Sequence, residues 1–157
     1  MVNADDASTP VLLIDVDGPL NPYAAPPHRR PEGYTTHRWH PEGWHGRKPL
    51  RVWLNPDHGP ALLALPYLPF PDSPSRPDAR LFWKTKYVVE WAGGQPFVWI
   101  DDDTTRYDQE YVDQHHDGFG RILHIKPHLG LQDEDFAVLN AWAPDAVAAT
   151  TTKGEPR

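Results

Sequence analysis

The sequence contains no cysteine among its 157 residues. Disulfides, thiolate metal sites and cysteine nucleophiles are therefore all excluded. A surplus of positive charge is also missing, since 15 lysines and arginines stand against 22 aspartates and glutamates and leave a net charge of −7. Proteins that bind nucleic acids normally carry a basic surplus or a basic run, so nucleic acid is not expected as a partner.

Long apolar runs are absent as well. No stretch of the sequence approaches the roughly 18 to 20 uninterrupted apolar residues that a membrane-spanning helix needs. Residues 1–10 include two aspartates and no apolar run, which is not typical of a secretory signal. We therefore expect a soluble, cytoplasmic protein without a membrane partner.

What is present indicates a folded chain. Apolar residues make up 39% of the sequence, and seven tryptophans are available for a core. Fifteen of the 19 prolines lie before residue 78, so regular structure should be sparse in the first half and denser in the second. We expect one domain at 11–145, between a flexible amino-terminal segment at 1–10 and a flexible tail at 146–157.

Three short apolar runs, at 11–14, 97–100 and 121–125, are typical of strands that are buried on both faces. The segments between them contain helical patterns, and strands that alternate with helices predict an α/β fold with a parallel sheet. Ligands of such sheets bind at the carboxyl ends of the strands. Asp15 and Asp101 follow the first two runs directly and should lie there.

Helices and a flap are expected around these strands. Helical spacing and turn signals predict helices at 60–65, 84–92 and 133–142, and one or two helical turns at 109–112. Residues 21–54 break the alternation, because six prolines are interleaved with aromatic residues there. We interpret 33–39 and 50–54 as the strands of a hairpin-like flap over the end of the first strand.

The first candidate motif is Asp15-Val16-Asp17-Gly18, which places two carboxylates one residue apart just after a buried strand. A loop can direct both carboxylates to one centre, where one attacks or binds a metal and the other transfers a proton. Gly18 allows the chain to turn away. The alternative is a simple acidic turn at the end of a strand.

The second candidate motif is Asp101-Asp102-Asp103, at the end of what should be a neighbouring strand. Two like charges about 4 Å apart repel by about 4 kcal/mol at an effective dielectric constant near 20, so converging carboxylates need a cation or a proton. A set of oxygen ligands favours Mg²⁺. Lys84, which opens the predicted helix at 84–92, would add a compensating charge. The alternative is an exposed acidic loop.

Taken together, these residues resemble the haloacid dehalogenase-like superfamily of phosphohydrolases. The resemblance depends on Asp15-Val16-Asp17-Gly18 after an apolar strand, on Trp83-Lys84 before a helix, and on the apolar run that ends at Asp101-Asp102. Small actinobacterial-type members are especially similar, because their first motif continues Gly-Pro-Leu-Asn-Pro, as it does at 18–22. The match covers 11–142 and implies a Rossmann-like fold with the flap inserted at 21–54.

The resemblance also implies a mechanism, the hydrolysis of a small phosphomonoester in two steps. Asp15 would attack phosphorus and form an aspartyl-phosphate, while Asp17 would protonate the leaving oxygen and then activate a water molecule. The implied Mg²⁺ ligands are Asp15, the main-chain carbonyl of Asp17, and Asp101 or Asp102. The implied contacts to the phosphorylated substrate come from Gly18, Asn21 and Lys84.

One part of the family pattern is missing. The family carries a serine or threonine at the end of a second strand, but 66–83 contains five prolines and is too short for a further strand and crossover helix. One strand-helix unit is therefore expected to be lost, with Ser73, Ser75 or Thr85 as substitute hydroxyl donors. Loss of such a donor costs a factor of roughly 10² to 10³ in rate, so weak activity is expected. The lost strand would expose a sheet edge, through which a homodimer could form.

Other functions remain open at this level. A non-catalytic binding or regulatory protein could keep the acidic Mg²⁺ site without its chemistry. His37-x-x-His40 has a spacing that can bind zinc, although no cysteine supports it. A phospho-acceptor receiver domain also uses clustered aspartates and a pair such as Lys126-Pro127, but in receivers the acidic pair leaves the first strand and a single acceptor aspartate leaves the third. The order here favours the hydrolase.

Overall fold

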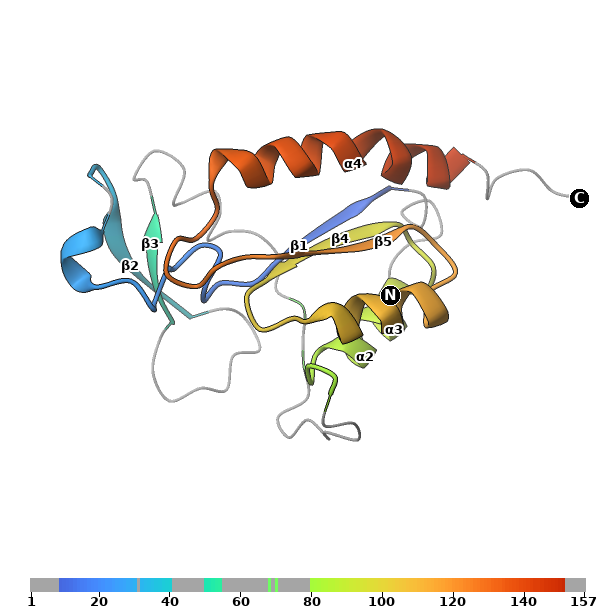
Figure 1. Cartoon of the computed structure of the whole chain (residues 1–157), viewed down its shortest axis with the longest axis horizontal. Helices are drawn as coiled ribbons and strands as arrows, with labels where there is room; N and C mark the ends of the chain where they lie inside the picture. Colours follow the sequence, from blue (N-terminus) through green and yellow to red (C-terminus); the bar gives the residue numbers. More distant parts are fainter. Residues whose placement is uncertain are drawn as a thin grey trace, which may run out of the picture.

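A computed structural model describes residues 9–30, 32–40, 50–54, 68, 70 and 80–151 (Figure 1). The strands in these residues are β1 (Val11–Ile14), β2 (Thr35–Trp39), β3 (Leu50–Leu54), β4 (Phe97–Asp101) and β5 (Gly120–His124). The α-helices are α2 (Thr85–Ala92), α3 (Arg106–His115) and α4 (Asp133–Thr151), and Pro27–Arg29 form a short 3-10 helix. None of the helices in these ranges has the length and apolar character of a membrane span.

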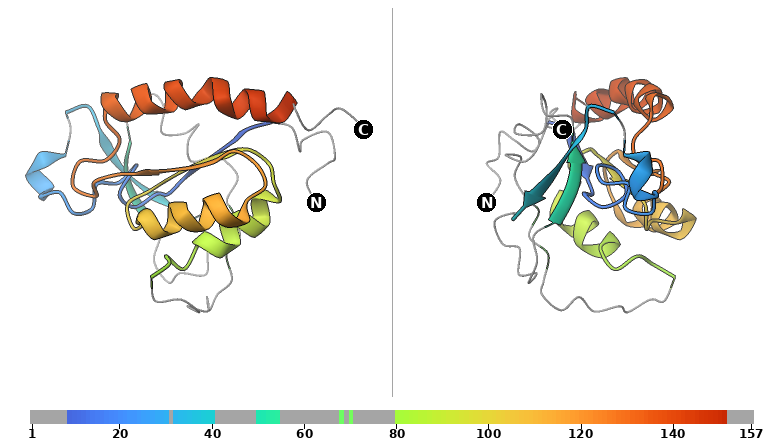
Figure 2. Two further views of the ribbon diagram at one scale, coloured as in Figure 1. Left: turned by 45° about the vertical axis from the view of Figure 1, so that its right-hand side comes forward. Right: turned by 90° about the vertical axis from the view of Figure 1, so that its left-hand side faces the viewer.

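The centre of the fold is a small parallel sheet with strand order β1-β4-β5. Helix α4 covers one face of this sheet, and α2 and α3 cover the other (Figures 1 and 2). The structure thus confirms the predicted α/β fold and the three predicted parallel strands.

Strand β4 forms the middle of the core, because all five of its residues are buried. Alternate side chains point to opposite faces of a strand. Phe97 and Trp99 therefore pack with residues of α2 and α3, whereas Val98 and Ile100 lie in a second cluster that includes Trp142 of α4. A strand that is buried on both faces needs an unbroken apolar sequence, which explains the run before Asp101.

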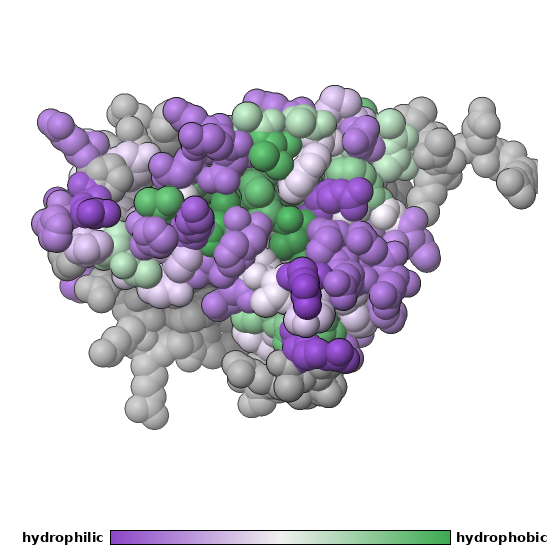
Figure 3. Space-filling model, in the orientation of Figure 1, coloured by the Kyte–Doolittle hydropathy of each residue, from purple (hydrophilic) through white to green (hydrophobic). Residues whose placement is uncertain are grey.

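The outer edge of β5 is capped by one side chain. Gln109 of α3 accepts a hydrogen bond from the Ile122 amide at 2.8 Å and donates one to the Gly120 carbonyl at 3.2 Å, much as a neighbouring strand would. A band of apolar side chains lies between α3 and α4 on this side of the molecule (Figure 3). Because an unpaired edge invites pairing with another chain, Gln109 protects this edge of the sheet.

Two helices are longer than the sequence predicted. Helix α3 replaces the expected turns at 109–112, because Thr105 and Asp108 form a capping box that fixes its first turn. Helix α4 continues to Thr151 instead of ending at Trp142, and Ala146 is buried. Residues 146–151, expected to belong to a flexible tail, thus continue the helix, since an alanine-rich sequence favours helix even after Pro144.

The predicted hairpin in 21–54 is confirmed as a separate two-stranded antiparallel sheet. β2 and β3 pair from Thr35 opposite Leu54 to Trp39 opposite Leu50. This sheet lies toward the carboxyl end of β1 (Figure 1). The predicted helix at 60–65, most of the proline-rich stretch at 66–83, and the chain ends at 1–8 and 152–157 lie outside the described residues.

Candidate metal centre

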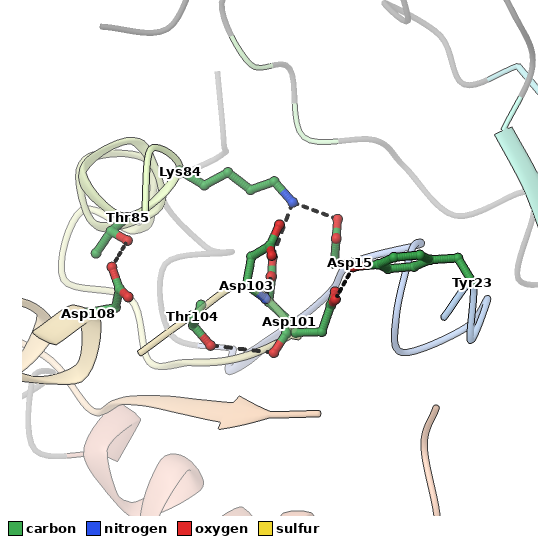
Figure 4. Close-up of polar contacts among 9 residues, drawn as sticks. Asp15, Tyr23, Lys84, Thr85, Asp101, Asp103, Thr104 and Asp108 are labelled. Atoms are coloured by element: carbon green, nitrogen blue, oxygen red, sulfur yellow. Dashed lines mark hydrogen bonds and ion pairs between the residues drawn. The ribbon is translucent and has the colours of Figure 1, made fainter. Parts of the chain in front are cut away.

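Three carboxylates from two neighbouring strands meet at one edge of the parallel sheet. Asp15 follows β1, Asp101 is the last residue of β4, and Asp102 comes next. Ile14 is in register with Ile100, and the Asp15 amide donates a hydrogen bond to the Ile100 carbonyl at 2.9 Å. One oxygen of each of the three carboxylates lies within 4.8 Å of the other two, so the predicted convergence is confirmed (Figure 4).

Lys84 links the carboxyl ends of β1 and β4. Its Nζ donates hydrogen bonds to Oδ1 of Asp15 at 2.7 Å and to Oδ2 of Asp101 at 3.1 Å (Figure 4). Nζ also lies 5.2 Å from the centre of the Phe82 ring and 5.9 Å from that of the Trp83 ring. Since the Lys84 side chain is only 13% exposed, its charge acts directly on the two carboxylates with little screening by solvent.

Burial controls the electrostatics of these groups. It raises the pKa of Asp15, and burial together with the Asp15 charge raises the pKa of Asp101 to about 6. The pKa of Asp102 is also raised, mainly by burial. Burial of Lys84 acts to lower its pKa, but the charges of Asp15 and Asp101 outweigh this and raise it.

With all four groups ionised, three negative charges and one positive charge leave a net charge of −2 within a few ångströms. Such an arrangement favours binding of either protons or a divalent cation. The group offers only oxygen donors, and it is the one cluster of this kind within the described ranges. In that part of the chain, His37 and His40 belong to no metal-binding group, which gives the zinc alternative no support.

Asp102 is held in place by two residues of the first loop. Tyr23 donates a hydrogen bond from its hydroxyl to Oδ2 of Asp102 at 3.0 Å (Figure 4), and this bond contributes most to raising the pKa of Tyr23 to about 12. Gly18 has a φ of 90°, and a Cβ at this position would overlap the Asp102 carboxylate. Gly18 thus permits both the turn and the close approach of Asp102. Tyr23 could not be predicted from the sequence, because its contact with Asp102 spans 79 positions and has no local signal.

Asp17 and Asn21 form a small unit beside the carboxylate cluster. Asn21 donates a side-chain hydrogen bond to Oδ1 of Asp17 at 2.8 Å, and its carbonyl accepts one from the Gly18 amide at 2.8 Å. The Asp17 side chain is not one of the three clustered carboxylates. The loop therefore orients the second aspartate of the motif through Asn21, a residue that the family resemblance implies as a substrate contact.

The structure excludes one of the three substitute hydroxyl donors. Thr85 is fully buried, and its hydroxyl donates a hydrogen bond to Oδ1 of Asp108 at 2.6 Å (Figure 4). This hydroxyl points into the protein and cannot contact a ligand at the cluster. The other two candidates, Ser73 and Ser75, lie outside the described residues.

No family model, curated protein or solved structure matches this chain. The function must therefore be inferred from the geometry and charges of the site itself. The site consists of the Asp15, Asp101 and Asp102 carboxylates at the carboxyl ends of β1 and β4, of Lys84 at the start of α2, and of the neighbouring Asp17.

Proposed function

We propose that this protein is a Mg²⁺-dependent phosphohydrolase of the haloacid dehalogenase-like type, which hydrolyses a small phosphomonoester through an aspartyl-phosphate. The observation that carries this proposal is the meeting of Asp15, Asp101 and Asp102 within 4.8 Å, with Lys84 bound to the first two. Phosphoryl transfer depends on positioning and on neutralising charge, and these residues supply both.

The donor set fits Mg²⁺, which takes hard oxygen ligands. Asp15, the main-chain carbonyl of Asp17, and Asp101 or Asp102 would hold the ion. When bound, Mg²⁺ would neutralise the clustered carboxylates and stabilise the charge that develops on the phosphoryl oxygens. The overlap that a Cβ at Gly18 would make with Asp102 supports a site whose shape depends on close approach of the chain.

Asp15 is the nucleophile in this proposal. One of its carboxylate oxygens forms a bond to phosphorus while the bond between phosphorus and the ester oxygen breaks. Lys84 holds Oδ1 of Asp15 at 2.7 Å, which orients the carboxylate and opposes the rise in its pKa that burial causes. The same ammonium group can contact the phosphoryl oxygens as they approach.

Asp17 is the general acid and base. Because Asn21 binds Oδ1 of Asp17, the other carboxylate oxygen can give a proton to the leaving alcohol in the first step. In the second step the same oxygen takes a proton from the water molecule that attacks the aspartyl-phosphate. The β2–β3 hairpin lies toward this end of the sheet and would cover the bound substrate.

A second candidate is a non-catalytic protein that keeps the Mg²⁺ site. One observation favours this alternative. The Thr85 hydroxyl donates its hydrogen bond to Asp108 and so does not serve a phosphoryl group. Without a hydroxyl donor to the phosphoryl group, the rate would fall by a factor of roughly 10² to 10³. We therefore expect hydrolysis to be slow.

An aryl phosphate assay distinguishes the two candidates. The wild-type protein is compared with and without Mg²⁺, next to Asp15→Asn and Asp17→Asn. A hydrolase loses activity without Mg²⁺ and in both variants, because each lacks a group that makes or breaks a bond. Equal rates in all samples would leave only the binding protein.

A further inference from the structure

A further buried carboxylate lies near Lys84 but outside the cluster of Asp15, Asp101 and Asp102. Asp108, in the first turn of α3, is fully buried. Its Oδ1 accepts hydrogen bonds from the Phe82 amide at 2.8 Å and from the Thr85 hydroxyl at 2.6 Å. Its Oδ2 accepts hydrogen bonds from the Thr105 amide at 2.7 Å and from the Thr105 hydroxyl at 3.0 Å. Each oxygen of this carboxylate thus accepts two hydrogen bonds from within the protein.

These partners place Asp108 between the two segments that form the site. Phe82 and Thr85 stand on either side of Trp83-Lys84 in the sequence, so one carboxylate oxygen fixes the turn from which Lys84 extends. The other oxygen binds Thr105, in the loop that follows β4 and carries Asp102. Figure 4 shows the Thr85–Asp108 bond apart from the carboxylates that Lys84 contacts.

We propose that Asp108 is a positioning residue that holds Lys84 against Asp15 and Asp101. It acts through Lys84 and contacts neither the substrate nor the metal. This inference deepens the proposed function and rests on it, because the position of Lys84 matters for catalysis only if Asp15 transfers a phosphoryl group.

The arrangement needs a carboxylate at this position. An ionised aspartate accepts hydrogen bonds at both oxygens, whereas asparagine offers one oxygen and one amino group that is itself a donor. In Asp108→Asn, that amino group would face either Thr105 or the pair formed by Phe82 and Thr85. In the first case the Thr105 amide would lose its acceptor, and in the second the Phe82 amide would, so the link between the turn before α2 and the loop after β4 would be broken on one side.

Another set of contacts could hold Lys84 without Asp108. The Lys84 ammonium lies over the Phe82 and Trp83 rings, and the Phe82 ring stacks on Trp99 of β4 with centres 6.1 Å apart. If this aromatic packing alone fixes Lys84, substitution of Asp108 leaves the lysine in place. The experiment therefore has to report on Lys84 itself.

Nuclear magnetic resonance of the lysine ammonium groups gives such a readout without requiring activity. The chain has five lysines, so the Lys84 signal can be assigned by its loss in Lys84→Arg. In Asp108→Asn, we expect this signal to shift or to broaden through faster proton exchange. The matched control is Asp113→Asn on the same helix, where the side chain is 55% exposed and pairs with Arg121 at 3.5 Å. The control should leave the Lys84 signal unchanged.

A second pair of variants covers the case in which Asp108→Asn fails to fold. Thr85→Val removes the hydroxyl that binds Asp108 but keeps the size of the side chain, whereas Thr85→Ser keeps the hydroxyl. The proposal expects the Lys84 signal to change in Thr85→Val and to stay in Thr85→Ser. An unchanged signal in Thr85→Val and in a folded Asp108→Asn would overturn it.

Kinetics then connect the position of Lys84 to the reaction. Asp108→Asn should lower kcat by about 10- to 100-fold, as expected for a residue that orients a site group. In a Lys84→Ala background the same substitution should change kcat by less than about twofold, because Asp108 acts only through the lysine that is already removed. If Asp108→Asn lowers kcat equally in the wild-type and Lys84→Ala backgrounds, Asp108 has a merely structural role. The same conclusion follows if the variant has a lower unfolding temperature but an unchanged kcat. If the wild type has no activity, the proposed function fails, while the lysine signals still decide the position of Lys84.

Discussion

Replacing Asp101 by asparagine should stabilise the metal-free protein at neutral and alkaline pH. Asp101 has a fully buried side chain, and its carboxylate faces Asp15 across the sheet edge. Burial and the Asp15 charge raise its pKa from 3.8 to about 6, although Lys84 opposes this rise. Ionised Asp101 is therefore less stable in the folded protein than in the unfolded chain, and the substitution removes the buried charge.

The size of the effect follows from the pKa. A rise from 3.8 to about 6 corresponds to about 3 kcal/mol of lost stability at pH 8, where Asp101 is ionised in both states. Asparagine can still accept the hydrogen bond from the Asp103 amide, and the loss of the ion pair with Lys84 is already contained in this value, because Lys84 opposes the rise in pKa. We expect a gain of about 3 kcal/mol, which corresponds to about 6–12 °C in the unfolding temperature.

The sign of the pH dependence provides an internal check. Because the pKa is raised on folding, protonation of Asp101 stabilises the wild type as the pH falls through 6 toward 4. The advantage of Asp101→Asn should therefore be full at pH 8 and small near pH 4. Mg²⁺ at about 1,000 times its Kd should reverse the order, since it stabilises the wild type by about 4.1 kcal/mol.

Thermal and urea unfolding in the presence of a chelator, at pH 8 and near pH 4, measure these differences. Asp113→Asn is the control, because it removes one carboxylate from an exposed position. The reasoning is refuted if Asp101→Asn is less stable than the wild type at pH 8 without metal, or if Mg²⁺ stabilises both proteins equally.

Two further predictions concern the same site, and a third concerns the unpaired side of β1. Mg²⁺ affinity measured by calorimetry should fall by about tenfold for each pH unit below 6, because protons compete for Asp101. Independence of pH between 5 and 7 would contradict this. Gly18→Ala should lower the free energy of unfolding by about 1–3 kcal/mol and weaken Mg²⁺ binding, since φ is 90° and the new Cβ overlaps Asp102. Normal stability and affinity in this variant would be inconsistent with the packing described. β1 pairs only with β4 among the described strands, and Leu12 is 52% exposed, so light scattering at micromolar concentration should give the mass of a dimer. A monomeric mass would count against pairing through this edge.

The parallel sheet and the carboxylate cluster could be predicted because local sequence determines both. Short unbroken apolar runs identify strands buried on both faces, and parallel strands bring their carboxyl ends to one edge. The positions of Asp15 and Asp101 follow directly. Lys84 could be named from its place before a helical pattern, although its two ion pairs depend on the three-dimensional packing.

Other features had no local signal. Tyr23 meets Asp102 across 79 positions, and Thr85 meets Asp108 across 23, so both contacts exist only because distant segments fold together. Thr85 therefore remained a candidate for the phosphoryl contact until the structure showed its hydroxyl bound to Asp108. The extension of α4 beyond Pro144 was missed because proline usually ends a helix, whereas burial of Ala146 holds this one.

The most direct test of the central claim is fluorine nuclear magnetic resonance of the protein with Mg²⁺ and beryllofluoride, which mimics an acyl phosphate. If Asp15 accepts a phosphoryl group beside a divalent ion held by Asp101 or Asp102, the wild type should show one slowly exchanging bound signal. That signal should depend on Mg²⁺ and disappear in Asp15→Asn. A wild-type protein that gives no bound signal with Mg²⁺, or a signal that survives in Asp15→Asn, would contradict the account.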